Sequence, residues 1–344
     1  MGCQKCTTTP ILPNDLKRII VVANHEYMLA KLYNNFNSKF ELIQNNEYIE
    51  VKEDCEKFIL AIANSKIFSQ VELENMSILI LDINEVPTFR SYNKLKSLNY
   101  WITLYSSKDL KWILDNQSIV TYFQPIFDVK SGDIYAYECL SRGIREDGTI
   151  MPPNIMFESA KKTEMLFNLD RQCRLISLTN AKRKGITKNL FINFMPTAIY
   201  NPEFCLRDTL KTAKELDYDF NKIIFEVVET EHVENIEHLK TIFDYYLEIG
   251  FRVALDDVGA GYSSLNMLAV LKPNFIKIDM ELIRNIHNDS AKRAIVSSLC
   301  SISKEIGVIT LAEGIETLEE FNVIKELGVE LAQGYLLGKP SKDI

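Results

Sequence analysis

The sequence has no excess of basic residues, no long apolar run and no targeting segment, and each absence excludes a class of protein. Its 39 Lys and Arg are outnumbered by 47 Asp and Glu, which gives a formal net charge of −8. Because a nucleic-acid polymer is bound through clustered Lys and Arg, we exclude that partner. No apolar run reaches the roughly 18 residues of a membrane-spanning helix, and no signal peptide opens the chain. We therefore expect a cytoplasmic protein without a membrane partner.

Cysteine and histidine are few at the positions where they would build a site. The seven cysteines are an odd, scattered set, which argues against a disulfide framework. Cys3 and Cys6 form a Cys-x-x-Cys pair without a second pair of ligands, so a zinc ion would have to be shared between chains, and metal binding there stays open. The other five cysteines are expected to be buried apolar residues. None of the histidines follows a predicted strand, so we expect surface or packing roles for His25, His232, His238 and His287.

The first 107 residues predict a small α/β domain. Apolar runs at 18–22, 40–44, 77–81 and 100–105 are expected to be strands, and 26–36 and 54–63 amphipathic helices. Strands that alternate with helices favour a mainly parallel sheet. We assign this domain a regulatory or dimerising role.

Asp82 follows the apolar run 78–81, with Pro87 shortly beyond it. In this respect the domain faintly resembles a response-regulator receiver, in which an aspartate at that place accepts a phosphoryl group. The acidic pair expected after the first strand is replaced by Ala23-Asn24-His25, and no last strand with its lysine is recognisable. We therefore favour a strand-end aspartate that is not phosphorylated.

Residues 108–344 predict a β/α barrel. A helix over 107–116 leads into two strands, 122–129 and 134–140, that flank a hairpin signal at 130–133. A helix over 294–306 places Ile295, Leu299, Ile302 and Ile306 on one face and stops at Gly307, and another opens with a Thr317–Glu320 capping box. Roughly eight strands with intervening helices suit a barrel whose first strand is antiparallel. The later strands are expected at 190–194, 223–228, 253–255, 275–278, 308–312 and 331–336.

Asp256 and Asp257 end the apolar run 253–255, just before a Gly-x-Gly turn. Alone, they could simply solvate a strand end and cap the next helix. However, other polar residues end or interrupt the neighbouring predicted strands, and so many carboxylates at one barrel mouth cannot all stay ionised without a cation. These residues are Glu138, Asn193, Glu226, Lys277, Glu313 and Gln333.

The chemistry of this set points to metal-dependent phosphoester hydrolysis. Its ligands are all oxygens, which suits Mg²⁺ or Mn²⁺ and disfavours zinc. Several carboxylates can hold two ions, the arrangement used for in-line attack on phosphodiesters. Lys277 could hold the attacking water or stabilise charge on a phosphoryl oxygen, and Arg142 suits a bidentate grip on a phosphate.

Several separate motifs resemble those of the EAL domain, the cyclic di-GMP phosphodiesterase family, over about two-thirds of the chain. They occur in order from about residue 108 to residue 340, and together they are specific. They are 123–126 (Phe-Gln-Pro-Ile), 137–142 (Tyr-Glu-Cys-Leu-Ser-Arg), Asn193, 226–229 (Glu-Val-Val-Glu), 256–264 (Asp-Asp-Val-Gly-Ala-Gly-Tyr-Ser-Ser), 277–279 (Lys-Ile-Asp), 312–314 (Ala-Glu-Gly) and 333–335 (Gln-Gly-Tyr).

The resemblance implies a (β/α)₈ barrel that hydrolyses cyclic di-GMP to linear pGpG with two metal ions. It implies catalytic roles for Glu138, Asp256, Asp257, Lys277 and Glu313, with Lys277 positioning the water and Glu313 often given the role of general base. It further implies a homodimer through the barrel, with Glu229 anchoring the loop after Asp257. The implied metal ligands are Glu138, Asn193, Glu226, Asp256, Asp257 and Glu313, and the implied substrate contacts are Gln124, Leu140, Arg142, Asp279 and Gln333.

Three residues depart from the family pattern near these ligands. Val228 and Ala260 each replace a threonine, and Val258 replaces a phenylalanine. Each lost hydroxyl removes a hydrogen bond worth about 1 kcal/mol, which loosens the loop and leaves the ligands in place. We therefore expect an active enzyme that is slow or regulated.

Three other functions compete with the enzyme. A catalytically silent cyclic di-GMP receptor that signals through the first domain is the main alternative, and the intact ligand set favours the enzyme over it. A pure scaffold would have no use for that set. A glycosidase needs two carboxylates and would leave the rest unexplained.

Overall fold

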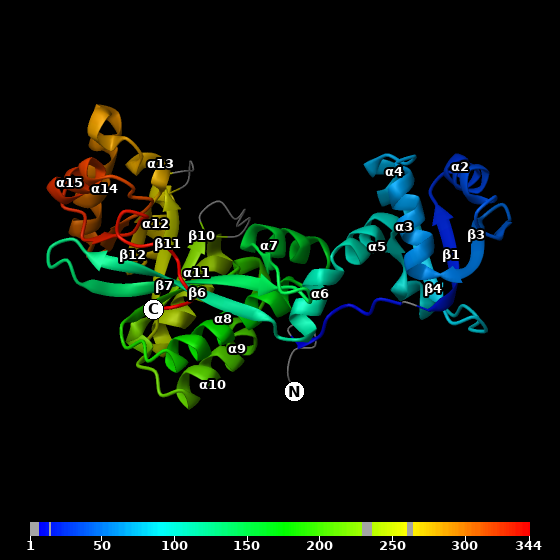
Figure 1. Cartoon of the computed structure of the whole chain (residues 1–344), viewed down its shortest axis with the longest axis horizontal. Helices are drawn as coiled ribbons and strands as arrows, with labels where there is room; N and C mark the ends of the chain where they lie inside the picture. Colours follow the sequence, from blue (N-terminus) through cyan, green and yellow to red (C-terminus); the bar gives the residue numbers. More distant parts are fainter. Residues whose placement is uncertain (1–6, 14, 229–235, 260–263) are drawn as a thin grey trace. The chain divides into compact units, whose positions relative to one another are not determined.

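The computed structural model describes residues 7–13, 15–228, 236–259 and 264–344, without the side chains of residues 228 and 264. These residues form two compact units (Figure 1). One contains residues 9–115 and 154–165, and the other contains residues 7–8, 116–153 and 166–344. In these units, residues 108–115 and 154–165 group with the first unit. The domain boundary at residue 107 stays a prediction.

The first unit is built on a five-stranded sheet in the order β2-β3-β1-β4-β5. Every neighbouring pair is antiparallel. Ile19 and Val21 of the central strand are fully buried and belong to the core of this unit. Its elements are β1 (Leu16–Ala23), α2 (Glu26–Phe36), β2 (Leu42–Gln44), β3 (Tyr48–Asp54), α3 (Cys55–Ser65), α4 (Gln70–Asn75), β4 (Met76–Leu81), β5 (Lys96–Ser97), α5 (Leu98–Ser106) and α6 (Lys108–Asp115).

The small α/β domain is confirmed, but the expected parallel sheet is wrong. The sequence reading missed β3, which forms a tight hairpin with β2. The Asn45 side chain accepts hydrogen bonds from the backbone N–H groups of Glu47 and Tyr48 and so shapes the turn. After that turn β3 runs antiparallel to both neighbours, which is the ordinary result of a β-α-β-β-α-β order.

Residues 100–105, expected to be a strand, lie within helix α5. The Ser97 side chain accepts a hydrogen bond from the backbone N–H of Tyr100 and caps the helix. The apolar residues then recur at helical spacing, so that Leu98, Trp101, Leu104 and Tyr105 are buried. A short apolar run does not distinguish a strand from a buried helix by itself.

Asp82 lies just beyond β4, as expected, and its side chain is largely exposed. It forms an ion pair with Lys17 at 2.8 Å, which lowers the pKa of the carboxyl group. The antiparallel sheet differs from the parallel sheet of a receiver domain. Asp82 is thus a strand-end aspartate held by a neighbouring lysine.

The second unit is a closed barrel of eight strands, with its first strand reversed as predicted. The strands follow the order β6-β14-β13-β12-β11-β10-β9-β7, and β6 pairs with β7 to close the ring. Strand β6 is antiparallel to both neighbours, and the others run parallel. The strands are β6 (Ile119–Asp128), β7 (Ile134–Ile144), β8 (Ile150–Met151, a short strand that pairs antiparallel with the end of β7), β9 (Asn189–Asn193), β10 (Ile223–Val228), β11 (Arg252–Val258), β12 (Phe275–Ile278), β13 (Ile309–Ala312) and β14 (Leu331–Ala332).

Helices connect the parallel strands and cover the outside of the barrel (Figure 1). None of the described helices is both long and apolar enough to cross a membrane. Inside the barrel, a layer that includes Phe191, Phe275 and Leu331 fills the end where the parallel strands begin. The helices are α7 (Pro153–Lys162, which groups with the first unit), α8 (Leu166–Arg183), α9 (Pro202–Cys205), α10 (Arg207–Glu215), α11 (Ile236–Ile249), α12 (Ser264–Leu271), α13 (Met280–Ile283), α14 (Ser290–Ile306) and α15 (Leu318–Glu326).

Helix α14 ends and helix α15 begins as their sequences predict, but α14 begins at Ser290, four residues before the predicted start, because Asp289 caps it. Gly307 ends α14 in the left-handed region with φ 73°, and Thr317 and Glu320 form the capping box of α15. On α14, however, only Leu299 of the four predicted apolar residues is buried, whereas Ile295 is 46% exposed. The apolar residues that α14 buries are Val296 and Leu299. Part of the apolar face of this helix therefore stays outside the core.

Candidate active site

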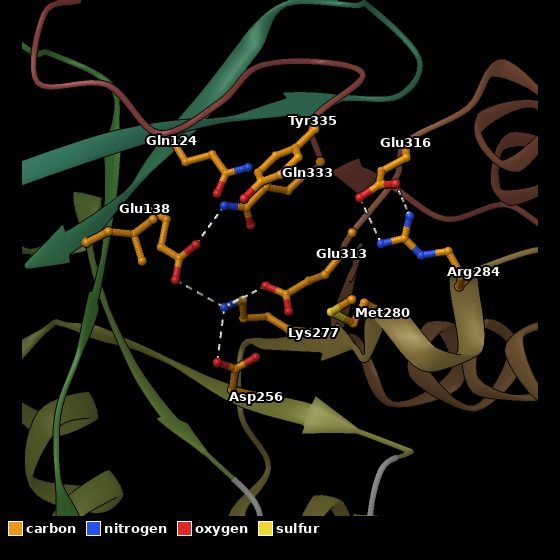
Figure 2. Close-up of a pocket in the computed structure, with 13 residues that line it drawn as sticks. Gln124, Glu138, Asp256, Lys277, Met280, Arg284, Glu313, Glu316, Gln333 and Tyr335 are labelled. Atoms are coloured by element: carbon orange, nitrogen blue, oxygen red, sulfur yellow. Dashed lines mark hydrogen bonds and ion pairs between the residues drawn. The ribbon is translucent and has the colours of Figure 1, made fainter. Parts of the chain in front are cut away.

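The predicted polar residues meet at one mouth of the barrel because parallel strands end at the same side. Glu226 lies in β10, Asp256 near the end of β11, Lys277 in β12, and Glu313 directly after β13. Glu138 enters from β7, where it pairs with Gln124 of the reversed strand β6. Glu138, Asp256, Lys277 and Glu313 line a cavity of about 300 Å³ (Figure 2).

Lys277 stands at the centre of the carboxylates and is 1% exposed. Its Nζ lies 2.7 Å from Glu313, 3.1 Å from Asp256 and 3.6 Å from Glu138 (Figure 2). It also lies 3.0 Å from Glu226. Burial opposes the charge on the ammonium, but the four carboxylates outweigh it and raise the pKa of Lys277 well above its usual value. The lysine therefore stays protonated and holds the acidic side chains together.

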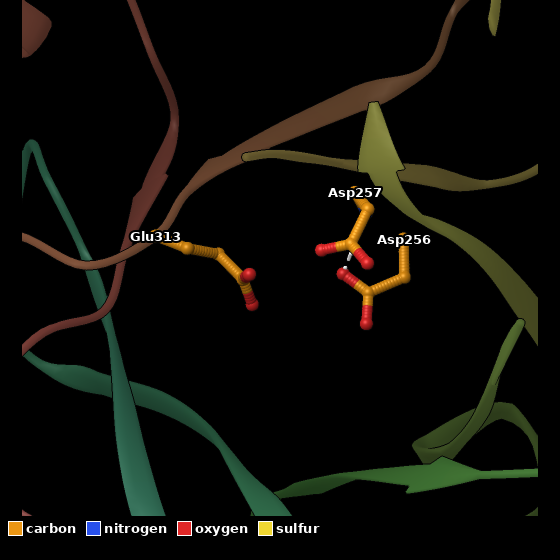
Figure 3. A group of neighbouring side chains, drawn as sticks. All are labelled: Asp256, Asp257 and Glu313. Atoms are coloured by element: carbon orange, nitrogen blue, oxygen red, sulfur yellow. Dashed lines mark hydrogen bonds between the residues drawn. The ribbon is translucent and has the colours of Figure 1, made fainter. Parts of the chain in front are cut away.

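Asp256, Asp257 and Glu313 form a tighter group within this site (Figure 3). Each offers a carboxylate oxygen, and the three oxygens lie within 4.8 Å of one another. Asp257 has a backbone φ of 56°, unusual for a residue with a side chain, and its N–H donates to Asp256 Oδ1 at 2.9 Å. The strained backbone turns the Asp257 carboxylate toward the same space as its neighbour.

Burial and mutual repulsion raise the pKa values of these acids. Burial, followed by the charges of Asp256 and Asp279, raises the pKa of Asp257 to about 6. Burial likewise raises the pKa of Glu226 and Glu313, although Lys277 partly offsets the effect. One ammonium does not neutralise this much negative charge, so the site favours additional positive charge.

Gln333 connects the last parallel strand to the acidic group. Its Nε2 donates to Glu138 Oε2 at 2.6 Å, which fixes that carboxylate against the cavity wall. Gly334 follows, where a Cβ atom would lie 2.1 Å from the carbonyl oxygen of Ile315. Only glycine fits this close approach, which seats the 333–335 segment beside Glu313.

Comparison with known proteins identifies the barrel. Residues 107–340, more than half of the chain, match the family model of the EAL domain. The chain belongs to the EAL domain family. An EAL protein from Vibrio cholerae O395, solved in its c-di-GMP-bound form, is 38% identical and superposes with a TM-score of 0.59, covering 65% of this chain and 92% of that one.

Other relatives of this EAL domain are larger or more distant. The cyclic di-GMP phosphodiesterase PdeR of Escherichia coli K12 is 26% identical over 242 residues, covering 69% of this chain. The match spans only 36% of PdeR, about a third of its length. The structure of Klebsiella pneumoniae BlrP1 with manganese and cyclic di-GMP is 20% identical with a TM-score of 0.60 and covers 95% of this chain and 97% of that one, so its fold matches both units.

Most residues predicted for the EAL site line its cavity, and several lie just outside. Gln124, Glu138, Leu140, Asp256, Lys277, Glu313 and Gln333 line it. Asn193 donates to Glu138 Oε1 from β9 at 3.4 Å and so lies behind that carboxylate. Asp279 caps α13, and Arg142 donates to the carbonyl oxygen of Ser141 and lies over the Tyr122 ring. Cys3, Cys6, Glu229 and Ala260 lie outside the described residues.

Three cavity residues were missed by sequence reasoning: Met280, Arg284 and Glu316. Arg284 and Glu316 form an ion pair at the edge of the cavity, in which both terminal guanidinium nitrogens, Nη1 and Nη2, contact the carboxylate (Figure 2). Both follow strands that end in predicted site residues, Lys277 in β12 and Glu313 after β13. Residues in the loops that follow barrel strands often line the active site, so the position of Arg284 and Glu316 in the sequence could have predicted their place in the cavity.

Proposed function

We propose that this protein hydrolyses cyclic di-GMP to linear pGpG and depends on two divalent metal ions, Mg²⁺ or Mn²⁺. The observation that carries the proposal is the set of buried carboxylates around Lys277 in an EAL barrel whose relatives are named cyclic di-GMP phosphodiesterases. Every ligand position that the family resemblance implies holds the expected type of residue.

The chemistry of the donor atoms supports the metal requirement. Carboxylate oxygens are the ligands that Mg²⁺ and Mn²⁺ prefer, and Asp256, Asp257 and Glu313 offer three close together. Glu226 Oε1 is buried and has no hydrogen-bond partner in the described part of the chain, so it has an acceptor to spare. A bound divalent ion would neutralise phosphate charge and lower the pKa of a water molecule. We assign as ligands Glu138, Asn193, Glu226, Asp256, Asp257 and Glu313.

The side chains themselves supply positioning and proton transfer. Glu313 lies 2.7 Å from Lys277, so a carboxylate oxygen that is not bound to a metal ion is placed to take the proton of the attacking water as general base. Lys277 orients that water and stabilises charge on the phosphoryl oxygens. As the water oxygen bonds to phosphorus, the bond from phosphorus to the 3′ oxygen breaks, and the leaving oxygen takes up a proton from solvent while Glu313 keeps the proton of the attacking water. Gln124, Leu140 and Gln333 contact the dinucleotide from the cavity wall, with Arg142 and Asp279 at its edge.

Dimerisation through the barrel completes the proposal, and Glu229 would anchor the loop after Asp257. Val258 is fully buried at the end of β11, so the valine fills space there without an aromatic ring. We expect the missing hydroxyls at positions 228 and 260 to slow the enzyme by loosening this loop.

Hydrolysis of cyclic di-GMP with Mg²⁺ or Mn²⁺, followed by chromatography of the products, tests the proposal. We expect pGpG from the native protein and a loss of turnover of at least about 100-fold in Glu138→Ala, because several buried groups lose a partner. Glu146→Ala is the matched control, since that glutamate is exposed in the turn after β7.

A native protein that binds cyclic di-GMP, measured by calorimetry, without producing pGpG would refute the enzyme and leave the silent receptor. Turnover that persists in the presence of a chelator would refute the metal requirement alone.

A further inference from the structure

A second cavity, of about 490 Å³, lies at the mouth of the barrel opposite Lys277. Its wall includes Ile309 and Leu331, where β13 and β14 begin, and Asp128, where β6 ends. Glu313 and Gln333 follow the other ends of β13 and β14, so the two cavities share these strands without sharing a residue. Small-molecule sites have volumes of about 300–1,000 Å³, so this cavity is large enough for a ligand.

The floor of this second cavity is apolar. Val129, Val329 and Leu331 line it and are buried at 6%, 3% and 2% exposure. Tyr135 and Ile309 pack against the inner layer of the barrel and complete the wall. Such a surface fits a flat apolar group.

Hydrogen-bond donors surround this floor. The Tyr135 hydroxyl accepts a hydrogen bond from Arg252 Nη1 at 3.1 Å, which leaves its own proton free to be donated. Lys130 and Lys325 stand exposed at the rim and form no ion pair with any carboxylate in the described residues. Three residues with hydrogen-bond donors, two of them charged, therefore line the cavity.

The two carboxylates of the cavity already accept hydrogen bonds from neighbouring residues. Asp128 Oδ1 accepts from the N–H groups of Lys130 and Ser131 at 2.9 and 2.8 Å and so holds the hairpin turn. Glu330 Oε2 accepts from the N–H and the hydroxyl of Thr310 at 2.8 and 3.2 Å. One oxygen of each carboxylate is thus committed to hydrogen bonds inside the protein, whereas both ammonium groups are left to pair with a negative ligand.

We propose that this cavity is a second ligand site, for a small organic anion with a flat apolar body and one carboxylate, phosphate or sulfonate group. The flat body packs between Tyr135, Ile309 and Val329. The anionic group accepts hydrogen bonds from the Tyr135 hydroxyl and from the ammonium groups of Lys130 and Lys325. The site is independent of the proposed hydrolysis.

The fluorescent probe 1-anilinonaphthalene-8-sulfonate, an aromatic sulfonate, tests this site in the full chain. We expect saturable binding of one probe molecule, weakened by at least about tenfold in Lys130→Ala/Lys325→Ala, because both attractive charges are removed. Ile309→Trp should also abolish binding by filling the cavity. The control Lys214→Ala/Lys304→Ala removes the same charge from exposed positions of α10 and α14 and should bind as the native protein does.

Circular dichroism melting verifies that each variant is folded. If Ile309→Trp does not fold, the comparison of Lys130→Ala/Lys325→Ala with the native protein still tests the site. Probe binding that is equal in both lysine pairs would overturn the proposal. So would displacement of the probe by cyclic di-GMP, because the probe would then lie at the other mouth. Tighter binding of the aromatic cation thioflavin T would overturn the assigned ligand charge.

Discussion

At the scale of single residues, Lys277 decides how the acidic site is held together. Its ammonium group lies within 3.1 Å of Glu226, Asp256 and Glu313. A buried ion that loses its partner typically costs about 3–5 kcal/mol. Lys277→Met should therefore lower the free energy of unfolding by about 3–5 kcal/mol when a chelator is present to remove divalent ions. Urea denaturation measures this change.

A divalent ion can replace the charge that this variant lacks. We expect saturating Mn²⁺ to restore most of the lost stability of Lys277→Met, while hydrolysis stays depressed because the water is no longer oriented. Lys304→Met, on the exposed side of α14, is the control and should match the native protein. An equal loss of stability with and without Mn²⁺ would show that the lysine acts only through packing.

Asp257 predicts the pH dependence of metal binding. Its pKa is raised to about 6, so the proton is bound more tightly in the folded protein than in the unfolded chain. In the metal-free protein, ionisation of Asp257 therefore weakens the fold as the pH rises through 6. Metal binding has the opposite sign, because the ion needs the carboxylate and must displace the proton.

Calorimetric titration with Mn²⁺ between pH 5 and pH 8 checks this sign. Affinity should rise by up to about tenfold per pH unit below pH 6 for this one proton, and the contribution should level off above it. Asp257→Asn should bind more weakly and remove that part of the slope. An affinity that falls as the pH rises would contradict the assignment.

At the scale of elements, a buried ion pair on α8 fixes the loop that follows β9. Asp170 and Arg174 are 2% and 1% exposed and are joined at 2.7 Å. Asp170 Oδ1 accepts from the backbone N–H of Met195 at 2.9 Å, two residues beyond Asn193. Arg174 also donates to Thr209 on α10 at 2.7 Å. The helices thereby fix the backbone beside a proposed metal ligand.

Asp170→Asn should lower the free energy of unfolding by about 3–5 kcal/mol, because the Arg174 charge stays buried without its counter-ion. Asp208→Asn is the matched control, since it breaks the more exposed ion pair of Arg171 between the same two helices and should cost at most about 1 kcal/mol. Urea denaturation measures both. The folded fraction of Asp170→Asn should also bind Mn²⁺ more weakly, and unchanged affinity would limit the ion pair to a role in stability.

At the scale of the whole molecule, the barrel could be predicted further than the first unit. Asp256, Lys277 and Glu313 were found because each ends or interrupts an apolar run, and parallel strands bring such ends together. Arg284 and Glu316 belong to loops, whose paths depend on packing that no periodicity records. In the first unit, the apolar runs of β1 and β4 predict strands but do not predict the direction in which these strands run. That direction depends on the hairpin of β2 and β3, and β3 was not predicted because it contains several charged residues.

Removal of residues 1–107 should destabilise the segment 154–165. It belongs to the unit of residues 9–115 although it follows them in the chain, and Met156 and Met165 within it are fully buried. A truncated chain of residues 108–344 would expose these methionines. Hydrogen exchange of 154–165 should be at least about tenfold faster in the truncated chain than in the full chain, because local opening loses its opposing contacts. Equal exchange rates would show that the segment packs on the barrel alone.

The reversed strand β6 also determines when the barrel can form during synthesis. One edge of β6 pairs at once with β7, its neighbour in the chain, but the other edge pairs Asp128 with Leu331 and Phe123 with Ser341. Leu331 and Ser341 each follow their β6 partner by more than 200 residues, so they are synthesised long after β6. Until then the nascent sheet has two unpaired edges, the kind of surface that invites pairing with other chains. Closure is thus a late, long-range step, and the growing chain needs protection from aggregation until β14 has been synthesised.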